Sequence, residues 1–486
     1  MGRVILLATS CAVALAMPAA PAAEPANQPP PNIVFIMADD LGYGHLGCYG
    51  QTKIQTPQID RLAAEGMRFT QVYAGCNVCA PCRSVLMTGL NMGHTPVRAN
   101  SGGVPIRDAD TTVAEVLRRA GYATGGFGKW GLGDAGSPGV AHRQGFDEFF
   151  GYYDQVHAHS YYPPYLWHNE RKYPLPGNSG RDSDGLTGER RGQYSHDEIV
   201  RQALAFIRRH KDRPFFCYAP STIPHTELLV PEDSMEQYAG KWPEPNPYVT
   251  ENKHYSDQPR PRAAFAAMVS RLDREVGRIL DLLKELGLEE KTVIFFTSDN
   301  GGQGSGGPDP EFFRANGPLR GYKGSMYEGG LRVPMIARWP GRIQPGSVNH
   351  HVWYFADVMP TLAELAGAEP PPGIDGISVV PTLLGKAGQR QHEFLYWESS
   401  GFDGQTGLIR PNSLVQAVRF GDWKGIRSRP KAPLELYNLA HDVGETTNLA
   451  AAHPDLLAKI AAIIAAAHVD PPPQLEPEAP QGQAFR

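Results

Sequence analysis

The chain has 486 residues, of which 41% are hydrophobic and 20% charged, a composition that excludes a short peptide or a disordered tail. Lys and Arg number 46 against 51 Asp and Glu, so the formal charge of −5 gives no reason to expect a nucleic-acid or membrane-surface partner. Six cysteines are too few for a disulfide framework, yet Cys76, Cys79 and Cys82 lie close together. Because the net charge is weakly negative, any anion that this protein binds must be held by a local group of residues.

The N-terminal segment has the pattern of a secretory signal peptide. Arg3 precedes an apolar run over 4–17, and small residues follow it. The run is too short to span a bilayer, and no later stretch reaches the roughly 18 consecutive apolar residues of a membrane helix. We expect a signal peptide at 1–22 and a periplasmic or secreted protein without a membrane span; lipidation at Cys11 is the alternative.

Three apolar runs predict strands that are buried on both faces, and polar residues follow each of them. The runs are Asn32 to Met37, Pro214 to Tyr218 and Thr292 to Phe296. The polar residues that follow them are Asp39 and Asp40, His225, and Asp299 and Asn300, respectively. Parallel sheets place their ligands beyond the carboxyl ends of the strands, so these polar side chains are candidates for a common site.

Helical patterns lie between the predicted strands. One has Asp110 as its cap before Val113, and another covers Phe265 to Leu286, where apolar residues recur every three or four positions. Strands that alternate with helices predict an α/β fold with a large, mostly parallel sheet flanked by helices. We place this N-terminal catalytic domain at 23–385.

The pattern changes after about residue 385. Short strand-like runs separated by Gly, Pro and Asp occupy 394–397, 415–420, 423–426 and 434–437, and a helix is predicted over 455–467. This pattern indicates a smaller antiparallel sheet plus a helix in a C-terminal subdomain at 386–470. The segment 471–486 is rich in Pro, Gln and Glu, so we expect a mobile tail there.

The two acidic pairs favour a cation site. Asp39, Asp40, Asp299 and Asn300 offer only hard oxygen ligands, which suit Ca²⁺ or Mg²⁺ rather than a soft metal. One such pair after a strand usually caps a turn, but two pairs at the same kind of strand end favour metal binding.

The cysteine cluster lies at the start of a second candidate site motif. From Cys79 the sequence reads Cys-Ala-Pro-Cys-Arg-Ser-Val-Leu-Met-Thr-Gly. Pro81 suits the first turn of a helix, so Cys79 would lie at a helix N-terminus, where N–H groups favour a bound tetrahedral oxyanion, and Arg83 can point back at it. The alternatives are a Cys-x-x-Cys-x-x-Cys metal site or a disulfide involving Cys76 and Cys82; iron–sulfur ligation lacks a local fourth cysteine.

This string resembles the signature of the type I sulfatases, Cys-x-Pro-x-Arg followed by Thr-Gly. Further motifs recur in the family's order as far as about Asn448: Asn32 to Gly50, Gly128-Lys129-Trp130, Pro224-His225, Gly321 to Gly324, Glu328 to Pro334, Gly421 to Lys424, and Leu436 to Leu439. The resemblance implies an alkaline-phosphatase-like fold and a sulfuric ester hydrolase. It also implies that a maturation enzyme acting on the segment from Cys79 to Arg83 oxidises Cys79 to formylglycine (3-oxoalanine).

The resemblance also assigns roles. A divalent cation, Ca²⁺ rather than Mg²⁺, would be bound by Asp39, Asp40, Asp299, Asn300 and the group at position 79. Arg83, Lys129 and Lys323 would hold the sulfate. The hydrated aldehyde would attack sulfur, and the alcohol would leave with a proton from His225 or Lys323, which divides a slow hydrolysis into two steps.

One departure from the family pattern bears on the mechanism. Many sulfatases carry a histidine two residues after the first lysine, where this chain has Gly131. His157 and His159 are candidate substrate-binding replacements, because residues at i and i+2 share a face in an extended segment; the alternative is a surface loop.

The substrate class is a further expectation. The aromatic segment 161–168 could stack on sugar rings, which favours a sulfated carbohydrate over a simple aryl sulfate. The alternatives are a phosphonate or phosphate ester hydrolase and a non-catalytic exported binding protein with an unmodified Cys79.

Overall fold

The computed structural model describes residues 29–100, 105–179, 190–250, 255–401, 410 and 412–470. The predicted signal peptide and tail lie outside these residues. In the described part of the chain, none of the helices combines the length and the apolar character that crossing a membrane requires.

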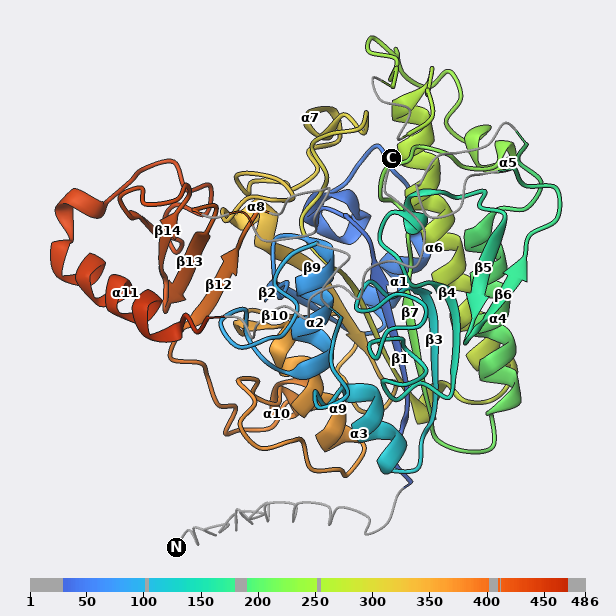
Figure 1. Ribbon diagram of the computed structural model, residues 1–486, viewed down its shortest axis with the longest axis horizontal. Coiled ribbons are helices and arrows are strands. Elements are labelled where there is room, and N and C mark those ends of the chain that lie inside the picture. Colours follow the sequence, from blue (N-terminus) through green and yellow to red (C-terminus); the bar gives the residue numbers. More distant parts are fainter. Residues whose placement is uncertain are drawn as a thin grey trace, which may run out of the picture.

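A large sheet forms the centre of the molecule (Figure 1). Its strand order is β10-β2-β9-β8-β1-β7-β3-β4-β5-β6, and β11 pairs with β2. The strands are β1 (Asn32–Ala38), β2 (Met67–Tyr73), β3 (Ala123–Lys129), β4 (Glu148–Tyr152), β5 (Tyr165–His168), β6 (Arg171–Pro174), β7 (Phe215–Pro220), β8 (Thr292–Ser298), β9 (Arg332–Arg338), β10 (Ser347–Asn349) and β11 (Trp353–Tyr354). The central strands β8, β1, β7, β3 and β4 are parallel, whereas β9, β5 and β6 run antiparallel to their neighbours. The prediction of a mostly parallel sheet is confirmed.

Helices cover both faces of this sheet, because its central strands are apolar on both sides. In β1, Ile33, Phe35 and Met37 join one hydrophobic core, and Val34 and Ile36 join the other. The first core contains residues of α2 (Cys79–Thr88), α3 (Val113–Arg119) and α9 (Val358–Leu365); the second contains residues of α1 (Pro57–Ala64), α4 (Ser195–Arg209) and α6 (Pro261–Glu285). Figure 1 shows these two sets on opposite sides of the central strands.

Shorter helices connect these elements. They are the four-residue helices α5 (Glu232–Met235), α7 (Pro310–Phe313), α8 (Glu328–Leu331) and α10 (Val380–Leu383), and 3₁₀ turns at Tyr43–His45, Gly47–Tyr49, His157–His159, Glu289–Lys291, Phe355–Asp357 and Ala450–Ala452.

The cap that was predicted for α3 is wrong. Thr112, not Asp110, precedes the helix: its hydroxyl accepts the N–H of Glu115 at 3.2 Å, and the Glu115 carboxylate accepts the N–H of Thr112 at 2.8 Å. This reciprocal capping box satisfies two backbone donors at once. Asp110 instead accepts the backbone N–H of Arg107 at 2.8 Å.

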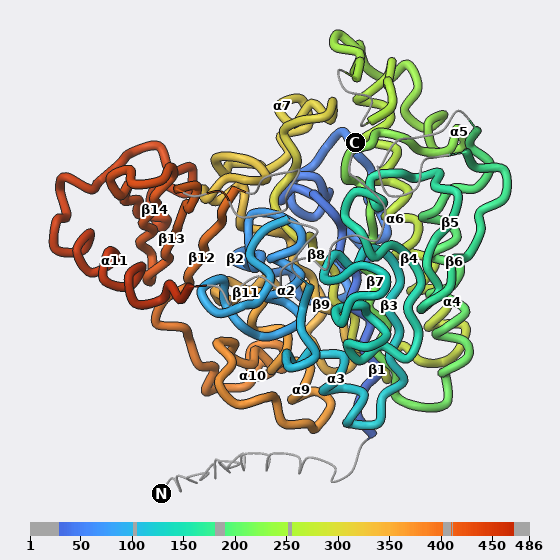
Figure 2. Tube along the Cα trace, viewed as in Figure 1, coloured from blue at the N-terminus to red at the C-terminus, as the bar shows by residue number. Residues whose placement is uncertain are grey.

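The C-terminal region forms a second, four-stranded antiparallel sheet, as predicted. Its strands, in spatial order, are β12 (Leu395–Ser399), β13 (Val415–Phe420), β14 (Trp423–Arg427) and β15 (Glu435–Asn438), and α11 (Pro454–Ala467) follows. A small core that includes Tyr396, Leu436 and Ile460 joins the helix to the sheet. Figure 2 shows this unit in red at one side of the molecule, far from the β5–β6 hairpin on the opposite side.

Candidate active site

The polar residues that follow three adjacent strands meet at one edge of the large sheet. Ala38 of β1 pairs in register with Ser298 of β8, and Met37 pairs with Pro220 of β7. Because the three strands are parallel, the residues that follow them lie beyond the same edge. The structure brings together Asp39, Asp40, Asp299, Asn300 and His225, all of them buried.

The backbone turns sharply at Asp40, which has a φ of 63°. A non-glycine residue rarely adopts this left-handed conformation, and such strain concentrates at functional sites. The turn lets the Asp40 N–H donate to Asp299 Oδ1 at 3.1 Å, and lets Asp40 Oδ1 accept from Asn300 Nδ2 at 2.7 Å. Burial, reinforced by the charge of Asp39, raises the pKa of Asp299 to about 7.

Cys79 begins α2 beside this acidic cluster. Val78 is extended, with φ −144° and ψ 159°, and the Cys79 thiol donates to Asp39 Oδ1 over 3.4 Å. Burial, followed by the charge of Asp39, raises the pKa of the Cys79 thiol well above its ordinary value. A thiol held in its protonated form is a poor nucleophile.

The other two cysteines of the cluster form no disulfide. All cysteines in the described part of the chain are free. Cys82 Sγ accepts the N–H of Gly75 at 3.3 Å, and the Cys76 thiol donates to Asn77 Oδ1 at 3.3 Å. Both are buried core residues of α2 and the segment before it.

Three cationic side chains surround the carboxylates. Lys129 Nζ lies 2.7 Å from Asp39 Oδ2, and Lys323 Nζ lies 2.8 Å from Asp40 Oδ2. Arg83 Nη2 lies 2.8 Å from Asp299 Oδ2. Each lysine has a raised pKa, because the attraction of the carboxylates outweighs the burial that would lower it.

The guanidinium of Arg83 joins two strand ends. Besides the Asp299 contact, its Nη1 donates to the carbonyl of Lys129 at 2.6 Å. These contacts link the end of β3 to Asp299, which follows β8.

His225 follows β7 and faces Asp40. Its Nδ1 donates to the carbonyl of Thr226, and its Nε2 lies 3.4 Å from Asp40 Oδ2. Burial, followed by the charge of Lys323, lowers the pKa of His225 well below its ordinary value. Nδ1 faces a carbonyl and therefore carries a proton, whereas Nε2 faces the Asp40 carboxylate.

The structure separates the two histidines that were expected to share a face. The His159 ring stacks on His225, with ring centroids 4.5 Å apart and an interplanar angle of 13°. The His157 ring packs instead against Tyr152 and Tyr165, and burial lowers its pKa to about 3. The expectation assumed an extended segment, whereas His157–His159 is a 3₁₀ turn, so only His159 reaches the cluster.

A buried ion cluster supports the loop that carries Lys323. We define the ion cluster as Glu328, Arg332, Lys424 and Glu445. Lys424 Nζ of β14 lies 2.8 Å from Glu328 Oε1 and 3.1 Å from Glu445 Oε1, and it is completely buried. The C-terminal sheet is thus tied to α8, which follows the Lys323 loop. The sequence motifs included Glu328, Arg332 and Lys424 but gave no sign that they pair.

Asn77 is a supporting residue that sequence reasoning missed. Its side-chain Nδ2 donates to the carbonyl of Gly324 at 2.9 Å, and the backbone carbonyl of Asn77 accepts the Gly324 N–H at 2.9 Å. These contacts fix the residue after Lys323. A single asparagine two positions before Cys79 has no pattern that would reveal this role.

The cluster has the properties of a divalent-cation site. Ligand atoms from Asp39, Asp40, Cys79 and His225 all lie within 4.8 Å of one another. In the described part of the chain, the buried Asn300 Oδ1 has no hydrogen-bond partner. Carboxylate and amide oxygens predominate, so the donor set fits a hard cation.

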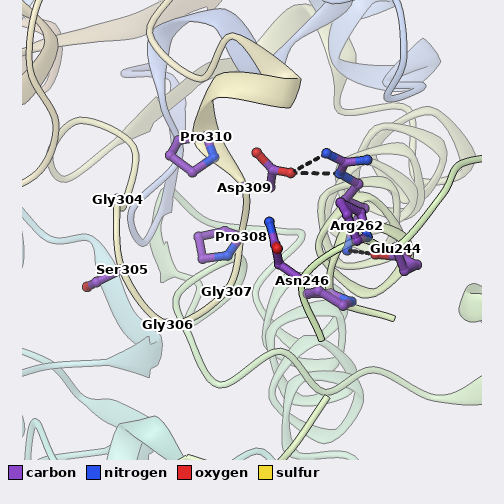
Figure 3. A pocket seen from close by; sticks show the side chains of 12 residues that line it. Glu244, Asn246, Arg262, Gly304, Ser305, Gly306, Gly307, Pro308, Asp309 and Pro310 are labelled. Carbon is purple, nitrogen blue, oxygen red and sulfur yellow. Dashed lines mark hydrogen bonds and ion pairs between the residues drawn. The ribbon is translucent and has the colours of Figure 1, made fainter. Parts of the chain in front are cut away.

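A cavity of about 220 Å³ lies between the loop Gly304–Pro310 and residues at the start of α6, among them Arg262 (Figure 3). The loop Gly304–Pro310, which follows the strand end that carries Asn300, forms one wall. Figure 3 shows Arg262 paired with Asp309 on the opposite side, at 2.6 Å. Thr226 Oγ1 donates to the Ser305 carbonyl at 3.4 Å, so the residue after His225 contacts the wall of this cavity.

Comparisons with known proteins agree with this arrangement. A family model for Sulfatase matches residues 31–368, and one for N-sulphoglucosamine sulphohydrolase, C-terminal, matches residues 322–465. Arylsulfatase A from Homo sapiens is 34% identical over 88% of this chain and 86% of its own. N-acetylgalactosamine-6-sulfatase from Homo sapiens is 29% identical over 90% of this chain and 85% of its own. The solved structure of Ps i-CgsB in complex with k-i-k-neocarrahexaose superposes with a TM-score of 0.76 at 27% identity, over 93% of this chain and 96% of that one.

Proposed function

The chain belongs to the sulfatase family and is a sulfuric ester hydrolase, and from this premise we propose that it removes sulfate from a carbohydrate at a formylglycine formed from Cys79. The observation that carries the proposal is the placement of Cys79. It opens α2, is buried, and lies 3.4 Å from Asp39 in a cluster with cationic side chains on its other sides. Its raised pKa makes the thiol itself unsuitable as the nucleophile, which supports its conversion.

The cation of this proposal is Ca²⁺, held by Asp39, Asp40, Asp299, Asn300 and the group at position 79. The unpartnered Asn300 Oδ1 and the three buried carboxylates support this assignment. When bound, Ca²⁺ would supply positive charge to a sulfate oxygen, and formylglycine would supply a hydrated aldehyde as the nucleophile.

The chain's own cationic residues would bind and orient the sulfate. Lys129 and Lys323 pair with different carboxylates, Asp39 and Asp40, and the charges of both lysines act on the group at position 79. Arg83 contributes charge from behind, while its bonds to Asp299 and the Lys129 carbonyl hold the strand ends together. Such preorganised donors stabilise the charge that develops on the sulfate.

The proton for the leaving alcohol would come from the side of the site formed by Lys323 and His225. Both contact Asp40 Oδ2, at 2.8 and 3.4 Å, so both face the same region. His159 covers the far face of the His225 ring and fixes its plane. We assign His159 to substrate binding at this edge and assign His157 to packing.

Two observations support a carbohydrate as the alcohol. The cavity of about 220 Å³ has enough volume for a sugar ring, and Thr226, the residue after His225, contacts the loop that forms one of its walls. The similar structure of Ps i-CgsB is a complex with k-i-k-neocarrahexaose, and N-acetylgalactosamine-6-sulfatase is named for a sulfated sugar. The segment 161–168, in contrast, contributes its last four residues to β5 of the large sheet, and its first two, Tyr161 and Tyr162, are buried.

The remaining parts of the proposal concern maturation and domains. We assign residues 1–22 to a signal peptide and the protein to the periplasm or the exterior. A maturation enzyme would act on the segment from Cys79 to Arg83 before the protein is active. The catalytic domain would occupy 23–385 and the C-terminal subdomain 386–470.

The test is turnover by the full-length protein on a panel of defined sulfated saccharides, with an aryl sulfate and a phosphate ester alongside. We expect sulfate release from at least one saccharide and a tryptic peptide mass that shows formylglycine at position 79. Cys79→Ala should abolish turnover and leave the fold unchanged, as judged by its unfolding curve. Sulfate release by Cys79→Ala, or preference for the phosphate ester, would refute the proposal.

A further inference from the structure

Gly131 lies two positions after Lys129, one of the residues proposed to hold the sulfate. The ladder between β3 and β4 continues past the strand ends, because the N–H groups of Trp130 and Gly131 donate to the carbonyls of Tyr152 and Tyr153 at 2.9 and 3.1 Å. Trp130 packs into the core on Phe146, with ring centroids 5.7 Å apart.

The side chain of Gln155 fills the space that a side chain at position 131 would occupy. A Cβ built on Gly131 would lie 2.2 Å from Gln155 Nε2 and 3.1 Å from its Cδ. The φ of Gly131 is +75°, a conformation that side-chain-bearing residues rarely adopt. Both the backbone and the packing thus reserve this position for the Gln155 carboxamide.

The carboxamide of Gln155 is a buried donor without an acceptor. In the described part of the chain, Nε2 is shielded from solvent and has no hydrogen-bond partner. A buried polar group without a partner costs free energy, so such groups in folded proteins call for an explanation such as a ligand. An NH₂ group can only donate, and therefore it selects an acceptor such as a sulfate oxygen.

The loop that carries Gln155 is anchored at both ends of the site. The Asp154 carboxylate accepts the backbone N–H of His157 at 2.6 Å, which fixes the turn around Gln155. The charge of Lys129 opposes the burial that raises the pKa of Asp154, so the loop lies near that lysine. At its other end, His159 stacks on His225. The loop therefore spans the site from Lys129 to His225.

We propose that the Gln155 carboxamide is a sulfate-binding group, donating Nε2–H to a sulfate oxygen from the position where a side chain at residue 131 would otherwise stand. This inference rests on the proposed function for the identity of the anion. Because an amide cannot accept a proton at neutral pH, Gln155 binds and orients the sulfate and moves no proton.

The test measures binding of inorganic sulfate to the full-length Cys79→Ala protein with Ca²⁺ present, by calorimetry at constant ionic strength. Gln155→Ala should weaken sulfate binding about tenfold, equivalent to about 1.4 kcal/mol and near the lower bound for a hydrogen bond to a charged group. Gln155→Glu retains the shape but places a carboxylate against the anion, so it should weaken binding at least as much. Gln202→Ala, on α4, is the matched control and should leave sulfate affinity unchanged.

A second pair of variants separates binding from packing. Gly131→Ala must displace the Gln155 amide, so it too should weaken sulfate binding about tenfold. The double variant Gly131→Ala/Gln155→Ala should then bind sulfate as either single variant does, because both changes remove the same contact. A purely structural role would instead lower the unfolding temperature and leave sulfate affinity unaltered.

The possible failures are distinguishable. Sulfate affinities within about twofold of the parent in both Gln155 variants, or no sulfate binding by the parent, would overturn the Gln155 inference. Gln155-dependent sulfate binding by a protein that hydrolyses no sulfate ester would instead support this inference and refute the proposed substrate chemistry.

Discussion

Replacing Lys424 by methionine should destabilise the protein in a pH-dependent way. Methionine keeps most of the apolar stem and removes the charge that lies 2.8 Å from Glu328 and 3.1 Å from Glu445. Glu328 retains Arg332 as a partner. Glu445 keeps only the backbone N–H of Glu328, which donates to its Oε2 at 2.6 Å. The variant therefore leaves one buried carboxylate without a compensating charge.

The magnitude follows from burial. Removing one member of a buried ion pair costs roughly 3–5 kcal/mol, because the other charge stays desolvated. Burial already raises the pKa of Glu445 to about 7, against the opposing attraction of Lys424. Without Lys424 this pKa rises further. A carboxyl group whose pKa is higher in the folded state destabilises the fold increasingly as the pH rises through that value.

Urea unfolding at about pH 5.5 and about pH 8 tests this reasoning. We expect the free energy of unfolding of Lys424→Met to fall by close to the full cost of the broken ion pair at the higher pH. The fall should be clearly smaller at the lower pH, where Glu445 is protonated in both proteins. Lys424→Met/Glu445→Gln is the matched control and should recover much of the loss at the higher pH. An equal loss at both pH values, or one below about 1 kcal/mol at the higher pH, would refute the assigned charges.

Three further predictions concern other parts of the chain. Ca²⁺ should raise the unfolding temperature and a chelator should reverse the effect, since a ligand at a hundred times its Kd contributes about 2.7 kcal/mol; an unchanged unfolding curve would contradict a cation site. Burial raises the pKa of Asp273 to about 7. The unfolding free energy of the parent should therefore decline by at most roughly 4 kcal/mol between about pH 4 and 7, and Asp273→Asn should not show this decline. Thr112→Ala removes the capping box of α3 and should cost about 1 kcal/mol in urea unfolding, whereas Thr52→Ala, at an exposed position, should not.

The strands that position the site were predictable because they are buried on both faces. In β1, β7 and β8, long apolar runs end directly before polar residues. This pattern can be recognised in the sequence without knowing which strands are neighbours in the sheet. The antiparallel sheet was equally visible, because turn residues separate its short strands. Acidic residues at the carboxyl ends of parallel strands could therefore be placed together from the sequence.

The strand β3 shows why other elements were not predictable. Its sequence contains three glycines, which weaken any strand pattern. The structure requires them: a Cβ on Gly128 would lie 1.9 Å from the carbonyl oxygen of Pro220, and φ there is +139°. A strand whose glycines allow close approach between backbones has no run of apolar side chains by which the sequence could reveal it. The acceptors of Arg83 likewise depend on packing between distant segments, and the separation of His157 from His159 depends on a local 3₁₀ turn that the sequence did not reveal.

The pairing of lysines with carboxylates implies that cation and sulfate binding reinforce each other. Lys129 and Lys323 now donate to Asp39 and Asp40, the same carboxylates that a Ca²⁺ ion would share. A cation on these oxygens reduces their attraction for the lysines and so frees ammonium donors for a sulfate oxygen, while adding its own charge. Linkage requires the effect to be reciprocal.

Sulfate should therefore bind the Cys79→Ala protein about five- to a hundredfold more tightly with Ca²⁺ than with a chelator, the usual range for coupled sites. The lysine-dependent part can be separated from direct attraction between the two ions. Lys129→Met removes one shared donor, so the ratio between the two sulfate affinities should shrink but stay above one. If the ratio were unchanged in Lys129→Met, sulfate would be responding to the cation alone, and the carboxylate–lysine pairs would have no part in anion binding.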